Sequence, residues 1–310
     1  MLTYIIRRLL HMIPILFGVA CLVFLLFTAV GEDPVRVTLG EHATPEAVEL
    51  LRAKWGLDQS LPKQFLDFLG QIVTFDYGRS YNTDDRIVDM FNQGALVSLS
   101  ITGPPFVIGT ILNLIIAVTI AYYRGSKFDR YSTVVFVAAM SVSYLVYIIG
   151  FQYLLAFKAD LFEINGYAHG LESIPFLLLP WLITIVVTAG PDIRMFRTVF
   201  LDETKSDYVR TAHAKGTSEP KILLVHIMKN AMIPILTYTV NAIPFLLLGS
   251  FVMERFFSIP GLGDMMITAL NNGDFPVIKA MTMMIALAFS VFNLLTDILY
   301  AWVDPRIKLS

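Results

Sequence analysis

Long apolar stretches alternate with shorter polar ones along most of the chain. A helix needs about 20 apolar residues to cross the hydrocarbon core of a bilayer. Six stretches approach or exceed that length: residues 9–30, 96–123, 131–157, 174–189, 233–253 and 277–300. The fourth is the shortest and contains Pro180. The pattern predicts an all-α, polytopic membrane protein with six transmembrane helices.

The longest polar interruption, residues 31–95, is itself predicted to be helical. Thr44 can cap a helix that begins at Pro45, and Gly56 can end it. The residues expected to share one face of this helix are Val48, Leu51 and Trp55. A second helix after Pro62 would place on one face Phe65, Leu69 and Ile72. Two interpretations stay open for this segment: a seal over the outer mouth or a partner subunit, and a landing surface for a soluble binding protein.

Composition and charge support membrane insertion and set its direction. The chain is 56% hydrophobic and only 15% charged, whereas soluble domains carry about 25% charged residues, and its mean hydropathy is +0.66. With the N-terminus inside, the cytosolic pieces carry 14 of the 23 Lys and Arg residues. Because cytosolic loops are enriched in Lys and Arg, both termini are predicted to be cytosolic and residues 31–95 extracytoplasmic. The organisation is then residues 1–30, 31–95 and 96–310.

The cytosolic stretch of about residues 194–232 is too long for a turn and too short for a domain. Asp207 suits the start of a short helix, and Gly216 suits its end. The positions expected to share a face are Tyr208, Thr211, Ala212 and Lys215. Small Ala212 and Ala214 would allow a partner to approach closely, and Arg210 and Lys215 could pair with its acidic groups. The pattern indicates a docking element; the alternative is an ordinary solvated connector.

The sequence also lacks the signatures of several function classes. It contains no GxxxxGK[ST], HExxH, CxxC or GxSxG pattern, one cysteine (Cys21) and five scattered histidines. We therefore predict no catalytic residue, no cofactor, no metal site and no nucleic-acid partner for this chain. Few ionisable residues lie deep in the predicted spans, which argues against a self-powered pump.

Several strings, in order, resemble the permease subunits of ATP-binding-cassette (ABC) importers of the dipeptide, oligopeptide and nickel branch. They begin with Arg7-Arg8-Leu9-Leu10 and Ile13-Pro14, and continue through Asp33-Pro34, Gly56-Leu57-Asp58, Asp76-Tyr77-Gly78-Arg79-Ser80 and Arg124-Gly125-Ser126. They end with 207–216, 254–263 and Asp304-Pro305-Arg306. The chain is most similar to the first permease of such a pair. Two departures are Arg210-Thr211-Ala212, where the broad superfamily often has Glu-Ala-Ala, and a short outer loop at 158–172.

This resemblance implies a type I importer fold in a bacterial inner membrane, together with a set of partners. These are a second homologous permease, two ATPase subunits that bind ATP and Mg²⁺, an extracytoplasmic binding protein, and a peptide substrate. The implied ATPase-coupling residues are Asp207, Tyr208, Arg210, Thr211, Ala212, Ala214, Lys215 and Gly216. Candidate contacts of the binding protein or the outer gate are Trp55, Asp76, Pro260 and Gly261; for residues 260–263 the favoured interpretation is instead a tight re-entrant turn that caps the last two spans. The alternatives are a self-contained secondary transporter or channel, and an importer permease for nickel or another small solute.

Overall fold

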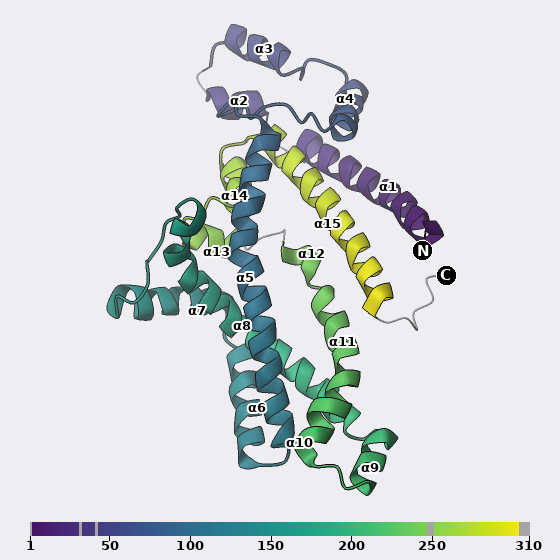
Figure 1. Ribbon diagram of the computed structural model, residues 1–310. Helices are drawn as coiled ribbons and strands as arrows, with labels where there is room; N and C mark the ends of the chain where they lie inside the picture. Colours follow the sequence, from purple (N-terminus) through teal and green to yellow (C-terminus); the bar gives the residue numbers. More distant parts are fainter. Residues whose placement is uncertain (1, 31–32, 41–42, 247–250, 304–310) are drawn as a thin grey trace.

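The computed structural model describes residues 2–30, 33–40, 43–246 and 251–303, and helices dominate it (Figure 1). Short π-helical or 3₁₀ stretches (Leu26–Val30, Gln152–Lys158, Gly170–Ser173 and Ile222–Ile227) adjoin several of the helices. The α-helices are α1 Leu2–Leu25, α2 Pro34–Leu39, α3 Pro45–Lys54, α4 Leu61–Thr74, α5 Ile87–Tyr122, α6 Lys127–Met140, α7 Tyr144–Phe151, α8 Ile174–Glu203, α9 Asp207–Ala214, α10 Glu219–Lys221, α11 Met228–Val240, α12 Ile243–Leu246, α13 Phe251–Phe256, α14 Leu262–Asn271 and α15 Phe275–Val303.

The described residues contain five helical segments long and apolar enough to span a membrane, or six if one bent pair is counted as a span. The five are Ile6–Thr28, Ile87–Tyr122, Gly170–Glu203, Glu219–Leu246 and Phe275–Ile298. The all-α, multi-span prediction is confirmed. The boundaries differ, because α5 begins before residue 96, α8 continues past residue 189 and the span predicted at 233–253 begins already at Glu219; residues 247–250 of that predicted span lie outside the described residues.

The third predicted span, 131–157, is not one straight helix. It is divided into α6 and α7 with its π-helical extension, and the two parts meet at 94°. The break falls at Ser141-Val142-Ser143, where serine hydroxyls compete with the helical ladder. Tyr147 crosses the bend and donates to the Ala139 carbonyl at 2.9 Å. Apolar composition alone therefore predicted the length of this segment but not its direction.

Figure 1 shows α5 running through the middle of the molecule, with α2, α3 and α4 at one end and α9 and α10 at the other. Helix α8 packs along α5, and α1 lies against α15. Arg8 of α1 and Asp297 of α15 form an ion pair at 2.5 Å. In the described part of the chain, the spans therefore join one end formed by α2, α3 and α4 to another formed by α9 and α10 (Figure 1).

The segment of residues 31–95 that is predicted to be extracytoplasmic, called the outer segment below, folds in its described residues as the capping positions predict. The Thr44 hydroxyl accepts a hydrogen bond from the Ala47 amide at the start of α3. Helix α4 begins at Leu61, with Pro62 in its first turn. The predicted inner face of α4 packs against one apolar cluster with α1 and α15, through Phe65, Leu69 and Ile72. This packing fixes the outer segment on the ends of two spans.

Candidate functional site

The end of the molecule that is predicted to be cytosolic is organised around α9 (Figure 1). Its buried residues are Val209 and Ala212. Both join an apolar cluster that α5, α8 and the start of the Glu219–Leu246 span share. The Tyr208 hydroxyl donates to the Glu203 carboxylate at 2.6 Å. Burial is the largest cause that raises the pKa of Tyr208, and this hydrogen bond is the second largest. Helix α9 is therefore held against the spans on one side.

The exposed face of α9 differs from the one predicted. The sequence placed Ala212 on the docking face, but its side chain is only 7% exposed and packs inside the chain. The face open to a partner instead carries Asp207, Arg210, Thr211, Ala214 and Lys215. The error has a simple cause: a small alanine suits a partner helix and this chain's own core equally well. Asp207 and Arg210 pair loosely at 3.5 Å and are almost fully exposed, so the pair contributes little stability.

Gly216 ends α9 as predicted. Its φ is +73°, a region that glycine adopts without the steric cost of a Cβ atom. The Thr217 amide donates to the Ala212 carbonyl and the Gly216 amide to the His213 carbonyl, which together form a Schellman motif. The chain then turns sharply towards α10.

The sequence assigned no role to His213, yet its side chain joins the two short helices α9 and α10. Its Nε2 lies 2.7 Å from a Glu219 carboxylate oxygen, and its Nδ1 lies 2.9 Å from the Val209 carbonyl. The hydrogen bond to Glu219 is the largest cause that raises the pKa of His213, and the hydrogen bond to the Val209 carbonyl is the second largest. The i to i+6 spacing across a glycine gives no periodic signal, so the sequence offered no means of finding the pair.

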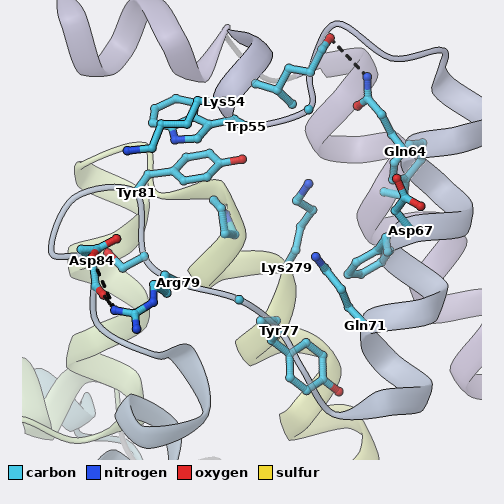
Figure 2. A pocket seen from close by; sticks show the side chains of 18 residues that line it. Lys54, Trp55, Gln64, Asp67, Gln71, Tyr77, Arg79, Tyr81, Asp84 and Lys279 are labelled. Atoms are coloured by element: carbon cyan, nitrogen blue, oxygen red, sulfur yellow. Dashed lines mark hydrogen bonds and ion pairs between the residues drawn. The ribbon is translucent and has the colours of Figure 1, made fainter. Parts of the chain in front are cut away.

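At the outer end, a pocket of about 430 Å³ lies between the outer segment and the start of α15 (Figure 2). Trp55 stacks on Tyr81 with ring centroids 3.6 Å apart and forms one wall. Figure 2 shows Lys279 reaching into the pocket from α15, and its ammonium lies 5.8 Å from the Phe68 ring centre. Asp76 is exposed near this pocket without lining it.

Asp274 fixes the loop that carries Tyr81. Its carboxylate accepts from the Ser80 hydroxyl at 2.5 Å and from the Tyr81 amide at 3.1 Å. Burial is the largest cause that raises the pKa of Tyr81, and the negative charge of Asp274 is the second largest. Asp274 and Ser80 lie 194 positions apart, so no local pattern could have paired them.

Of the two other outer candidates, Pro260 is exposed but Gly261 is buried. A Cβ atom on Gly261 would lie 2.4 Å from the carboxyl carbon of Glu254. That carboxylate accepts from the Ser98 hydroxyl and from the Gly263 and Asp264 amides at the start of α14. Gly261 thus makes room for an internal polar cluster and offers no surface to a binding protein, which corrects that part of the prediction.

Comparison with known proteins decides the family. A model of the binding-protein-dependent transport system inner membrane component matches residues 95–309. A second model, for the N-terminal part of such components, matches residues 1–100. The chain belongs to this family. It is thus an inner-membrane permease component of an ABC importer, as its sequence strings indicated.

This permease is also similar over its whole length to curated proteins. The glutathione transport system permease protein GsiC of Escherichia coli (strain K12) is 34% identical over 308 residues, which is 99% of each chain. The proteins of the same name from Shigella dysenteriae serotype 1 (strain Sd197) and Shigella boydii serotype 4 (strain Sb227) have the same identity and coverage.

Between its two ends the permease has a cleft of about 340 Å³ among α5, α8, α11 and α12. Asp192 of α8 lines it and was not singled out from the sequence. The Asn113 amide donates to one of its carboxylate oxygens at 3.0 Å, and the Tyr238 hydroxyl donates to the other at 3.1 Å. Three spans therefore meet at one carboxylate. Both of these neighbours are neutral side chains.

Proposed function

We propose that this chain is one of two permease subunits that together form the translocation path of an ATP-driven peptide importer. Two separate ATPase subunits would bind the permease pair, one of them at α9, and an extracytoplasmic binding protein would deliver the peptide at the outer segment. Full-length similarity to permeases named for glutathione, itself a tripeptide, supports a short peptide as substrate. Nickel and other small solutes are less well supported by these relatives.

One observation carries the coupling role: α9 is buried on one face and free on the other. Val209 and Ala212 tie it to the cluster around Phe196 and Phe200 of α8, so a displacement of α9 must move a span. Its opposite face presents a charged, exposed surface at the far end of the molecule from α2–α4 (Figure 1). A fully solvated connector has no need of a buried inner face.

The proposal is tested by isolating the chain from native membranes in mild detergent and identifying the proteins that remain attached. We expect a second permease and two ATPase chains, identical or different. Reconstituted with the binding protein, this complex should import short peptides only when ATP is supplied. The chain alone in lipid vesicles should neither hydrolyse ATP nor move peptide. Peptide uptake by the isolated, contaminant-free chain would contradict the proposal and favour a self-contained transporter.

A further inference from the structure

The cleft among α5, α8, α11 and α12 lies within the membrane-spanning part of the chain. Its walls come from three candidate spans, Ile87–Tyr122, Gly170–Glu203 and Glu219–Leu246. Most of its lining is apolar, including Phe106, Phe196 and Phe245. The polar atoms that do face it are consequently few, and their chemistry can be examined one by one.

Four of the five threonines that line this cleft present oxygen acceptors, because their hydroxyl hydrogens are already used; for the fifth, Thr110, no such bond is described. Thr184 and Thr239 each donate to a carbonyl of their own helix at 2.9 Å, and Thr188 does so at 3.3 Å. Thr102 donates to the Leu246 carbonyl at 2.8 Å. A hydroxyl has one hydrogen and two lone pairs. Each of these side chains can therefore still accept a hydrogen bond, but has no hydrogen left to donate.

Asp192 adds a negative charge to this acceptor surface. Asn113 and Tyr238 supply it with two neutral donors, and the described residues place no Lys, Arg or His within ion-pair distance of it. An ionised carboxylate can accept about four hydrogen bonds, so part of its capacity remains open. A carboxylate inside a membrane span is costly, and such residues mark substrate pathways or pair with a partner.

We propose that this cleft binds the ammonium group of a peptide as it crosses the membrane, with Asp192 as counter-ion and threonine oxygens accepting peptide N–H groups. The proposal rests on the proposed peptide import and names the chemical group that the path recognises. A free peptide amino terminus is a cation with three N–H donors, and Asp192 and the four threonine oxygens can accept from them. Anions and groups that can only accept hydrogen bonds are disfavoured by the same surface.

A purely structural role for Asp192, as a clamp between α5, α8 and α11, makes a different prediction. A clamp depends on the hydrogen bonds, whereas the proposed subsite depends on the charge. Tyr238→Phe removes one hydrogen bond to the carboxylate and keeps its charge. Asp192→Asn keeps the side-chain size but removes the charge and one of the two acceptor oxygens, so that each substitution affects one hydrogen bond and only this one affects the charge. The two substitutions therefore separate the two roles.

The first measurement uses the purified complex, with Thr188→Cys introduced in a Cys21→Ala background. During ATP turnover, the complex is reacted with one of two methanethiosulfonate reagents, a cationic trimethylammonium one or an anionic sulfonate one. Mass spectrometry then measures how fast the introduced cysteine of this chain is modified. Relative to their rates with a free thiol, the cation should react about 5–10-fold faster than the anion, as expected for a charge several ångströms away in a partly hydrated site. Asp192→Asn should abolish this preference, and Tyr238→Phe should keep it.

An unchanged preference in Asp192→Asn would overturn the proposal, and so would equal losses in Asp192→Asn and Tyr238→Phe. Failure of both reagents to reach Thr188→Cys at any stage of turnover would also overturn it, since a substrate path must open to solutes of this size.

A second measurement follows ATP-driven uptake of trialanine by proteoliposomes. Asp192→Asn should lower uptake at least about tenfold, and Tyr238→Phe should retain most of it; equal uptake by Asp192→Asn and the parent complex would overturn the proposal. If the parent complex imports no peptide at all, the proposed function fails, while the reagent preference still decides the charge selectivity of the cleft.

Discussion

At the scale of single residues, the turn at 260–263 shows how a buried charge dictates its neighbours. Glu254 is fully buried and accepts hydrogen bonds from the Ser98 hydroxyl and two backbone amides. The Leu262 amide also donates to Ser98 at 2.9 Å. The backbone approaches the carboxylate so closely that Gly261 and Gly263 leave no room for a side chain. Neither glycine lies in the left-handed region. Close packing therefore requires them, against Glu254 at Gly261 and against Phe251 and Glu254 at Gly263.

We predict that Gly261→Ala lowers the stability of the permease by about 1–3 kcal/mol, the usual cost of forcing an extra methyl group into a packed site. The midpoint of thermal unfolding in detergent measures the effect. Gly103→Ala is the matched control, because a Cβ atom there meets nothing within 4 Å and alanine favours a helix. Equal melting temperatures for the two variants would show that the turn relaxes freely around Glu254.

Residue-scale features were predictable where they depend on neighbours in sequence. Gly216 was identified because glycine after a short helix is a local stop signal, and its φ of +73° confirms this. Glu254, Asp274 and Asp192 were missed as organising residues. Their partners Ser98, Ser80 and Asn113 lie 156, 194 and 79 positions away, and such pairings depend on the tertiary fold.

At the scale of elements, α9 combines an accurate prediction with a wrong one. Its start, its length and its glycine stop follow from local capping rules and are confirmed. Its orientation was wrong for Ala212, because an eight-residue helix with few large apolar residues gives little indication of its buried face. The bend between α6 and α7 was missed for a related reason: the whole stretch 131–157 is apolar enough for one span, and two serines gave only a weak sign of the break.

The two alanines of α9 give a matched test of which face docks. Ala212→Asp would bury an unpaired carboxylate beside Val209 and the α8 cluster, which destabilises by several kcal/mol. We expect that variant to be poorly folded and scarce in the membrane. Ala214→Asp changes the exposed face, so the chain should insert normally.

For Ala214→Asp, the amount of ATPase that co-purifies with the chain should fall about tenfold, equivalent to about 1.4 kcal/mol. Normal ATPase recovery and transport with Ala214→Asp would mean that this face of α9 is an ordinary solvated surface. Normal abundance of Ala212→Asp would mean that α9 is not anchored to the spans through Ala212.

At the scale of the whole molecule, the hydrophobic pattern was sufficient for the fold class because a bilayer leaves so few structures available. The orientation of the chain in the membrane remains a prediction from the Lys and Arg distribution. It places the outer segment and α9 on opposite sides, and they do lie at opposite ends of α5 (Figure 1). The C-terminal string Asp304-Pro305-Arg306 lies outside the described residues.

Cysteine labelling tests this orientation. In a Cys21→Ala background, Ser60→Cys at the start of α4 should react with a membrane-impermeant reagent in intact cells. Ser218→Cys, just before α10, should react only after the membrane is opened. Both serines are exposed, so accessibility within the protein does not limit either reaction. Labelling of Ser218→Cys without Ser60→Cys in intact cells would invert the topology.

The uninterrupted length of α5 has a mechanical consequence. Its 36 residues form a rod about 54 Å long, well beyond the span of about 20 residues that a bilayer needs. One end adjoins the outer loop, where the Ile87 amide donates to the Gly78 carbonyl. Just past the other end, Arg124 donates to Thr204, three residues before α9. Moved as one body, this helix acts as a lever: a tilt of about 6° around its midpoint, where Pro104 and Pro105 lie, carries each tip about 3 Å in opposite directions.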